Sequence, residues 1–281
     1  MNLSLSKRIQ EKFPSMSSNH RKLAEFILQH YDKAVFLTAL ELGQTLGMSE
    51  STVIRFANML GYDGYPQLNK ALQDMIKNKI TTVERHRLSL KEDSNVLEWV
   101  FHTDMENLRK TMADVNVQDF RSAVQEIIQA RNIYIISLRS ATALGQFLHF
   151  YLHLLLKNSR LISGTGTLFE ELLAVGPKDV VIGISFPRYS RQTIEGLKYA
   201  QEKGAHTLAI TDSVTSPLSQ YSKRLLVAHS HMGSFIDSFV APLSLINALI
   251  IAVGTAESEK TTQALSQLED IWARFKTYYS E

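Results

Sequence analysis

The sequence predicts an all-α head followed by an α/β three-layer sandwich with a parallel sheet. Two observations predict this fold class. Apolar residues recur at helical spacing throughout residues 1–77, whereas from residue 131 onward short runs rich in β-branched residues alternate with helical patterns. Such alternation is typical of parallel strands with helices on both faces of the sheet. A chain of 281 residues is long enough for two separate cores.

The pattern divides the chain into three parts, with the head at residues 1–77, a linker and connector helix at 78–114, and the α/β domain at 115–281. In the head and connector we expect helices at residues 3–12, 17–30, 37–46, 50–60, 65–77 and 94–114. In the α/β domain we expect strands at residues 132–138, 160–163, 179–185, 206–212 and 223–229, and helices at residues 117–130, 141–157, 167–175, 191–203, 236–253 and 258–278.

The segment 37–68 indicates a helix-turn-helix. Its first helix is expected to stop at Gly47, since glycine readily takes the left-handed conformation that ends a helix. Ser49 is a suitable N-cap for the second helix, and Gly61 closes that helix.

The polar face of the second helix supplies the candidate DNA contacts. Arg55 and Asn58 are the candidates for reading bases, because arginine pairs with guanine and asparagine with adenine through two hydrogen bonds. Ser51 and Thr52 suit phosphate oxygens near the helix N-terminus. The DNA-binding prediction therefore comprises Ser49, Ser51, Thr52, Arg55 and Asn58. The alternative is an ordinary helical hairpin with a solvated polar face.

Charge and composition set limits on the partners. The net charge of +2 is too small for a broadly basic surface, but residues 1–91 carry 13 Lys and Arg against 8 acidic residues, which favours phosphate contact by the head. There is no cysteine, so disulfides and thiolate metal sites are excluded. The absence of disulfides is compatible with a reducing cytoplasm. The stretches 144–156 and 239–253 contain polar residues, so we expect buried helices, no membrane span and a cytoplasmic protein.

Three hydroxyl-rich loops follow strands of the α/β domain, at 137–140, 163–167 and 185–193. Each lies between a strand and the start of a helix, where free N–H groups and the helix dipole favour an anion. The ligand candidates are Ser137, Arg139, Ser140, Thr165, Ser185, Arg188, Ser190 and Thr193. Each Ser or Thr also has an alternative role as a helix N-cap, and Arg139 or Arg188 an alternative role in a surface salt bridge.

The whole chain resembles the RpiR family of bacterial transcriptional regulators, which join a helix-turn-helix to a sugar isomerase (SIS) domain that senses a phosphorylated sugar. The run SESTVIRFANMLGYDGYPQLNKAL carries the resemblance in the head, and strand order and loop placement carry it in the second half. The resemblance implies a flavodoxin-like, SIS-type domain. The SIS phosphate signature S-x-S-G-x-T reads here as Ser185 to Ser190, with Pro187 in place of the second serine and Arg188 in place of the glycine.

We therefore expect a regulator of carbohydrate metabolism that binds a double-stranded DNA operator and a small anionic effector, with a sugar phosphate as the leading candidate. We expect no catalysis, no cofactor and no metal, and a homodimer or homotetramer. Two alternatives stay open. One is a SIS-type sugar-phosphate isomerase, for which His149, His153, His229, His231, Asp237, Glu170 and Glu171 are conceivable bases. The other is a regulator whose SIS domain only dimerises.

Overall fold

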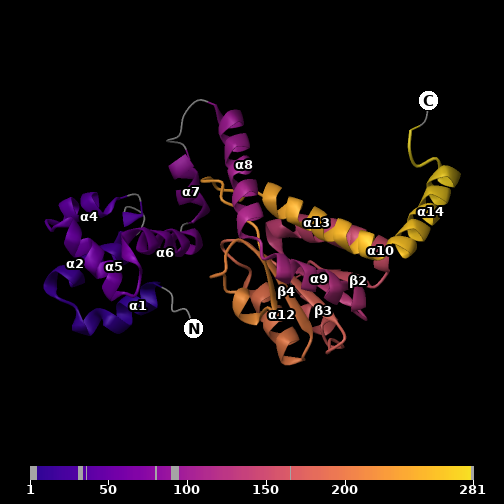
Figure 1. Cartoon of the computed structure of the whole chain (residues 1–281), viewed down its shortest axis with the longest axis horizontal. Coiled ribbons are helices and arrows are strands. Elements are labelled where there is room, and N and C mark those ends of the chain that lie inside the picture. The colour runs from indigo at the N-terminus through magenta and orange to yellow at the C-terminus, as the bar shows by residue number, and fades with distance from the viewer. Residues whose placement is uncertain are drawn as a thin grey trace. The chain divides into compact units, whose positions relative to one another are not determined.

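The structure is a computed structural model that describes residues 5–30, 34–35, 37–79, 81–89, 95–164 and 166–279 (Figure 1). The chain divides into two compact units, Met1–Arg85 and His86–Glu281. Each unit has its own hydrophobic core, as the length of the chain predicted.

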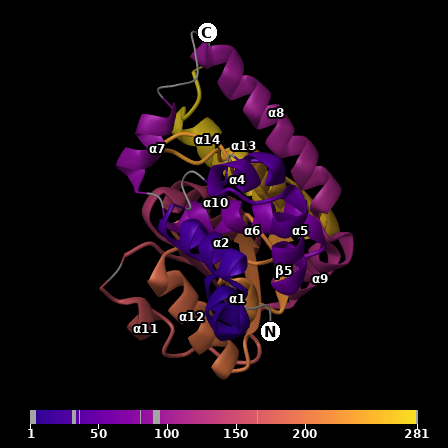
Figure 2. The same ribbon diagram turned by 90° about the vertical axis from the view of Figure 1, so that its left-hand side faces the viewer.

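The first unit is helical throughout its described residues (Figure 2). Its main helices are α1 (Leu5–Lys12), α2 (Ser18–Gln29), α4 (Ala39–Leu46), α5 (Glu50–Met59) and α6 (Gly64–Lys79). Helices α2, α4 and α6 all contact α5. Each helix contributes fully buried apolar side chains to one core, which includes Ile9, Leu23, Ile27, Leu42, Phe56, Leu68 and Leu72. The amphipathic spacing of these residues is what predicted the helices.

The second unit contains a five-stranded parallel sheet, as predicted. Its strands are β1 (Ile133–Ser137), β2 (Ser159–Ile162), β3 (Val180–Ile184), β4 (His206–Thr211) and β5 (Arg224–Val227). They are ordered β2-β1-β3-β4-β5, and every neighbouring pair is parallel. The carboxyl ends of all five strands therefore lie at one edge of the sheet, here called the carboxyl edge.

Helices cover both faces of the sheet (Figure 1). One face packs on α9 (Val117–Gln129), α10 (Thr142–Leu156) and α13 (Val240–Ala256). The other face packs on α11 (Leu168–Glu171) and α12 (Arg191–Glu202). Residues of β1 alternate between the two cores, with Ile133 and Ile135 in the first and Tyr134 and Ile136 in the second.

A buried carboxylate fixes the opposite edge of the sheet, where the strands begin. Asp179 accepts hydrogen bonds from Arg131 Nε at 2.9 Å, from Asn132 Nδ2 at 3.1 Å and from Gly176 N at 2.9 Å. Burial by itself would raise the pKa of Asp179, but these hydrogen bonds and the charge of Arg131 lower it below its ordinary value. The network joins the start of β1 to the start of β3.

Between head and sheet the chain forms α7 (Thr82–Ser89), where a linker or a helix tail was expected, and α8 (Val96–Asp114). The buried side chains of α8 are polar, Asn107 and Thr111. The apolar residues that recur along it at helical spacing are largely exposed, with Leu97 at 70% and Phe101 at 62%. The periodicity identified the helix correctly, but it did not show which face packs on the domain.

Two features differ at the end of the chain. Helix α13 starts at Val240, four residues later than predicted, because residues 236–239 belong to a loop in which Ser238 N donates to Ser230 O. Helix α14 (Ser258–Phe275) has no buried residue. Within the described ranges, no single helix is long and apolar enough to cross a membrane, and α13 and α14 meet the length and composition criteria only as a pair bent by 103°.

Candidate DNA-reading helix and ligand crevice

Helix α4 is capped at both ends, and the second cap begins the turn into α5. Thr38 and Glu41 form a capping box at the start of α4, with Glu41 Oε2 2.8 Å from Thr38 N. Gly47 ends α4 with a φ of 68°, as its place in the sequence predicted. A Cβ at Gly43 would lie 2.7 Å from the carbonyl oxygen of Met48, so the absence of a side chain there lets the two helices approach. These residues set the angle at which α4 presents α5.

The start of α5 differs from the prediction. Ser49 has the extended backbone of an N-cap, but its hydroxyl does not accept from a backbone N–H of the helix. Instead, Ser49 Oγ lies 2.9 Å from Ser51 Oγ and 2.9 Å from Thr52 Oγ1. The hydroxyls thus bond to one another. Thr52 N donates to Ser49 O at 3.0 Å, so it is the N–H groups of Glu50 and Ser51 that suit an external acceptor such as a phosphate oxygen.

The two residues proposed to read bases differ in how they are held. Arg55 is exposed, and its Nε donates to Ser51 O at 3.2 Å, which directs the guanidinium along the N-terminal turn. Asn58 is also exposed, but its Oδ1 accepts from Gly64 N at 3.1 Å. A side chain that reads adenine uses both amide atoms, and this acceptor is already engaged at the start of α6. Arg55 is the better placed of the two.

Helix α5 is anchored from behind by residues far away in the sequence. Arg8 Nη1 donates to Leu60 O at 3.0 Å, and its guanidinium lies 4.9 Å from the centre of the Tyr62 ring. The cation therefore lies at the negative end of the α5 dipole. On the other side, the His20 ring lies 5.6 Å from that of Phe56, and burial, then the charge of Arg55, lower the pKa of His20.

In the second unit, strand order defines where a ligand crevice lies. Strand β1 pairs with β2 on one side and with β3 on the other. The connection that leaves β1 therefore runs to one side of it, and the connection from β2 to β3 returns to the other side, so the strand order reverses at β1. In open parallel sheets ligands bind outside the carboxyl ends at such a switch point. The last paired residues of β1 and β3 are Ser137 and Ile184. The first and third hydroxyl-rich loops therefore begin side by side.

The first loop is held closed by buried contacts. Ser137 is fully buried, its Oγ donates to Ala141 O at 2.5 Å, and its carbonyl oxygen accepts from Thr142 Oγ1 at 3.0 Å. A Cβ at Gly145 would lie 2.4 Å from the Cβ of Ser137, so α10 packs directly on the end of β1. The Ser137 hydroxyl thus stabilises the loop from within. Arg139 and Ser140 are its exposed members.

The third loop is closed in a similar way. Ser185 is buried, and its Oγ accepts from Ser190 N at 3.0 Å. Ser190 is the N-cap of α12, where its Oγ accepts from Thr193 N at 3.3 Å. Thr193 is fully buried, and its Oγ1 has no hydrogen-bond partner among the residues that the structure describes. A buried hydroxyl without a partner in the first turn of α12 is consistent with a polar ligand there.

Arg139 and Arg188 both have a positive φ, 59° and 66°. A left-handed conformation costs a residue with a side chain about 1–2 kcal/mol. At Arg188 the backbone therefore keeps the conformation that suits the glycine of the SIS signature, while a guanidinium has been added. Residues held in such strained backbone conformations cluster at functional sites, which supports the choice of this edge as the candidate site.

The second loop contributes less. Thr165 lies outside the described residues, so its predicted role has no structural account here. Thr167 Oγ1 donates to Glu171 Oε1 at 2.9 Å, and Gly164 and Gly166 have nothing within 4 Å of a built Cβ. Among the described residues no group of three or more His, Asp or Glu side chains is arranged to hold a metal ion.

Comparison with known families agrees with the two units. Residues 3–79 match the helix-turn-helix domain of the rpiR family, and residues 126–252 match the SIS domain. The chain belongs to the RpiR family. It is a transcriptional regulator with a DNA-binding head and a SIS domain, as the resemblance of its sequence implied.

Relatives and solved structures match this RpiR-family regulator over its SIS domain or over nearly its whole length. An uncharacterised HTH-type transcriptional regulator of Haemophilus influenzae is 21% identical and covers 91% of this chain and 92% of its own. The SIS domain of an RpiR transcription factor from Sphaerobacter thermophilus superposes with a TM-score of 0.61 and 28% identity, over 63% of this chain and 99% of that one. The NanR protein of Vibrio vulnificus, complexed with ManNAc-6P, has a TM-score of 0.62 and 20% identity, over 96% and 98% of the two chains.

Sequence reasoning missed two groups of residues in this RpiR-family regulator. Tyr189 of the third loop donates from its hydroxyl to Asp212 Oδ1 at 2.7 Å, which joins that loop to the end of β4. The position of Asp212 directly after a buried strand was an available signal. The polar residues of α8 form the second group, and their periodicity gave no sign of their partners.

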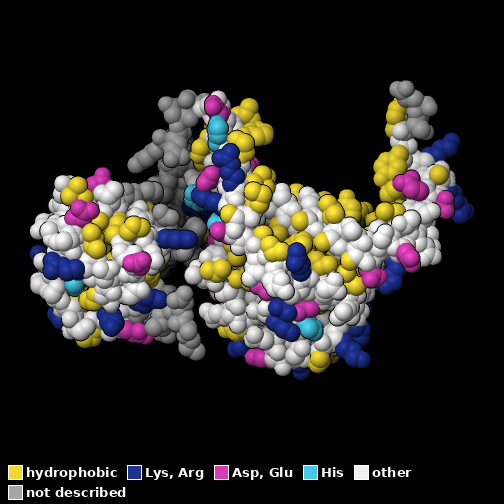
Figure 3. All heavy atoms as spheres, viewed as in Figure 1, with side chains coloured by type: hydrophobic (Ala, Val, Ile, Leu, Met, Phe, Trp, Pro, Cys, Tyr) yellow, Lys and Arg dark blue, Asp and Glu magenta, His cyan; other side chains and the backbone are white. Residues whose placement is uncertain are grey.

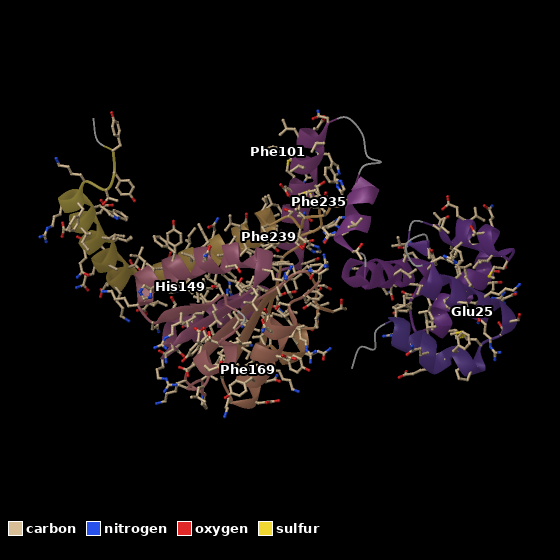
Figure 4. The ribbon with its side chains drawn as sticks, turned by 180° about the vertical axis from the view of Figure 1, so that it is seen from behind. Glu25, Phe101, His149, Phe169, Phe235 and Phe239 are labelled. Carbon is tan, nitrogen blue, oxygen red and sulfur yellow. The ribbon has the colours of Figure 1, made fainter. Side chains whose placement is uncertain are left out.

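Those partners lie in the loop 228–239, which follows β5 at the carboxyl edge. Thr111 Oγ1 accepts from His229 N at 2.8 Å, Asn107 Nδ2 donates to His231 O at 2.7 Å, and Ser238 Oγ donates to Asp104 Oδ1. Figure 4 shows Phe235 and Phe239 of this region below Phe101 of α8. The connector helix of this RpiR-family regulator is therefore bonded to a loop at the edge that carries the crevice.

Proposed function

We propose that this RpiR-family regulator binds an operator through α5 and an anionic effector, with a phosphorylated sugar as the leading candidate, at the switch point between β1 and β3. The convergence of the two closed loops at that point is the observation that carries the effector proposal. The phosphate end would lie at the N-terminus of α12, near Ser185, Ser190 and Thr193. The complex of NanR with ManNAc-6P supports this class of ligand.

We keep the predicted division of the chain, with the head at 1–77, the linker and connector at 78–114 and the SIS domain at 115–281. In the head, Arg55 is proposed to read bases, and Ser51 and Thr52 to contact phosphates with the N-terminus of α5. The protein would then work in the cytoplasm together with its DNA.

A second copy of the chain is proposed to cover α14. Its exposed apolar side chains include Ile271 at 50% and Phe275 at 69%, and Figure 3 shows hydrophobic side chains gathered on α14 and along α13. Most of the stability of a helix in a protein comes from packing of its apolar face, and α14, with 18 residues, has no buried residue. A two-fold dimer would bury this stripe and present two heads to a palindromic operator.

The effector is proposed to act on DNA binding through α8. A ligand at the carboxyl edge that favours one arrangement of the loop 228–239 would change the position of α8 by the hydrogen bonds to Asp104, Asn107 and Thr111. The ligand has to bind one arrangement better than the other, and a difference of about 1–3 kcal/mol is typical of such coupling.

We propose regulation and not catalysis as the role of the crevice. Sugar isomerisation needs a base positioned to take a proton from the substrate. Three of the conceivable bases, Glu171, His149 and His229, instead pair within the protein, with Thr167, Ser159 and Asp114 respectively. The Haemophilus influenzae relative, which aligns with 91% of this chain, is named as a transcriptional regulator, and this supports a regulatory role.

Two measurements test the proposal. Isothermal titration calorimetry of the full chain with a panel of hexose and aminosugar phosphates tests the effector, and the affinity for promoter DNA with and without each ligand tests the coupling. A ligand that binds and changes DNA affinity supports the sensor. Failure of every anionic ligand to bind would leave the SIS domain as a dimerisation module, and release of an isomerised sugar would indicate an enzyme.

A further inference from the structure

Four described residues other than glycine have a positive φ, and two of them are the crevice arginines. Lys157 and Lys276 are the C-caps of α10 and α14, where a left-handed residue commonly ends a helix. Arg139 and Arg188 are not C-caps. Arg139 begins the 3-10 turn Arg139–Ala141 that follows β1, and Arg188 lies in the loop after β3. Their conformation comes from the shape of the two loops, which places a guanidinium where a glycine would suit the backbone.

Hydrogen bonds close both loops around their arginine. The first loop is closed by Ser137 with Ala141 and by Thr142 with Ser137, and the third loop by Ser190 with Ser185. A long side chain on a closed loop loses less freedom on binding than one on a mobile loop. The two guanidinium groups therefore start from fixed points on the two sides of the switch point.

The two arginines differ in their position relative to a phosphate at the N-terminus of α12. A phosphate at the N-terminus of α12 would lie beside the third loop, the loop of Arg188. There Pro187 offers neither a hydroxyl nor an N–H, so Arg188 supplies donors that the signature serine would have supplied. Arg139 belongs to the other loop, and its exposed guanidinium makes no hydrogen bond or ion pair with any residue of the described ranges.

We infer that the effector carries a second oxyanion, a carboxylate or a second phosphate, which Arg139 binds across the crevice from the first phosphate. This inference rests on the proposed sensor function and narrows its ligand class. An arginine holds either oxyanion with two parallel hydrogen bonds. Tyr189 donates to the acidic neighbour Asp212, and the exposed Arg139 guanidinium adds positive charge to this edge, which favours an oxyanion there.

The test compares three probes by calorimetry on the full chain: a hexose 6-phosphate, the corresponding aldonic acid 6-phosphate and the hexose 1,6-bisphosphate. We expect at least one of the last two to bind about tenfold or more tightly than the first, as a hydrogen-bonded charge pair would give. The aldonate and bisphosphate arms distinguish a carboxylate from a second phosphate. Equal affinity of all three probes would overturn the inference.

Variants locate the effect. Arg139→Gln should remove the advantage of the doubly charged probe and leave the affinity for hexose 6-phosphate within about twofold. Lys157→Gln is the matched control, because it removes one positive charge from a residue with a φ of 62° that lies at the C-terminus of α10, away from the crevice. An equal loss for all probes in Arg139→Gln would assign Arg139 to the first phosphate and refute the inference.

The same experiments distinguish failure of the proposed sensor function from failure of the second-oxyanion inference. If no probe binds the wild-type chain, both the sensor proposal and the second oxyanion are refuted. If hexose 6-phosphate alone binds and changes DNA affinity, the sensor stands and the second oxyanion is refuted. Far-ultraviolet circular dichroism and the Tm of each variant confirm that the fold is unchanged in these comparisons.

Discussion

Asn107 of α8 donates a 2.7 Å hydrogen bond to the carbonyl oxygen of His231, a residue 124 positions later in the chain. Asn107 is 3% exposed, so its side chain is held between α8 and the loop, although His231 itself is an exposed residue. We expect Asn107→Ala to remove the hydrogen bond to the His231 carbonyl oxygen and to loosen α8 from the loop 228–239. The variant should still bind DNA and effector, but the change in DNA affinity caused by the effector should fall to less than half.

The control for this variant is Glu106→Ala, which removes a neighbouring exposed side chain whose ion pair is with Lys110 of the same helix. Fluorescence anisotropy of labelled operator, with and without saturating effector, measures both. A full effector response in Asn107→Ala would exclude this route of coupling.

Arg55→Ala should weaken operator binding and relax base preference at one position, because a bidentate base contact contributes about 1–3 kcal/mol of discrimination. Lys22→Ala is the charge-matched control on an exposed position of α2 and should lower affinity without changing the preference. Selection of bound sequences from a random DNA library measures the preference. An unchanged profile in Arg55→Ala would mean that another residue reads the base.

Gly43→Ala should destabilise the head although alanine favours helices more than glycine does. The added Cβ would lie 2.7 Å from Met48 O, and relief of that contact requires α4 and α5 to separate. A loss of about 1–3 kcal/mol in the free energy of unfolding of the head is expected from such overpacking, together with weaker operator binding. Gly164→Ala, which meets nothing within 4 Å, is the control. A stabilised head would contradict the close approach.

The stability of the SIS domain should depend on His149. Burial, then the charge of His153, lower the pKa of His149 from its ordinary value of 6.5. The folded domain therefore disfavours the protonated form, so this stability is fully present above pH 6.5 and is lost as the pH falls through the lower folded value. The free energy of unfolding, measured with urea at several pH values between 5 and 7.5, should change less steeply with pH for His149→Gln than for the wild type. The control, His102→Gln on the exposed face of α8, should keep the wild-type slope.

Phe275→Asp combined with Ile271→Asp should convert the proposed dimer to a monomer, since two carboxylates would have to be buried in an apolar interface. Ser266→Asp adds a charge to another exposed position of α14 and serves as the control. Sedimentation velocity at micromolar concentration measures the oligomeric state. A double variant that sediments like the wild type would show that α14 is not the interface.

The secondary structure was largely predictable because it depends on local signals. Periodicity predicted α5 and β3 to within about two residues, and Gly47 ended α4 as expected. The start of α13 was wrong because Ser238 bonds to Ser230 and Asp104, and such contacts between distant segments leave no periodic trace.

The candidate sites were predictable only as regions. Strand ends identified the loops that meet at the switch point, since topology alone brings them together. The roles within each loop depended on tertiary contacts: the Ser137 hydroxyl stabilises its own loop, and Asn58 Oδ1 is engaged at the start of α6. The sequence also showed an arginine in each loop, but it did not show their left-handed backbone, because that conformation is set by the three-dimensional shape of the loops.

The positive φ of Arg139 and Arg188 bears on how effector preference can diverge among such regulators. The strain belongs to the loop, so replacing either arginine with glycine relieves it and replacing it with another residue retains it. Single codon changes at these two positions would thus alter the charge offered to a ligand while the scaffold stays the same. A lineage could acquire a new metabolic signal in this way without rebuilding the connection to its DNA-binding head.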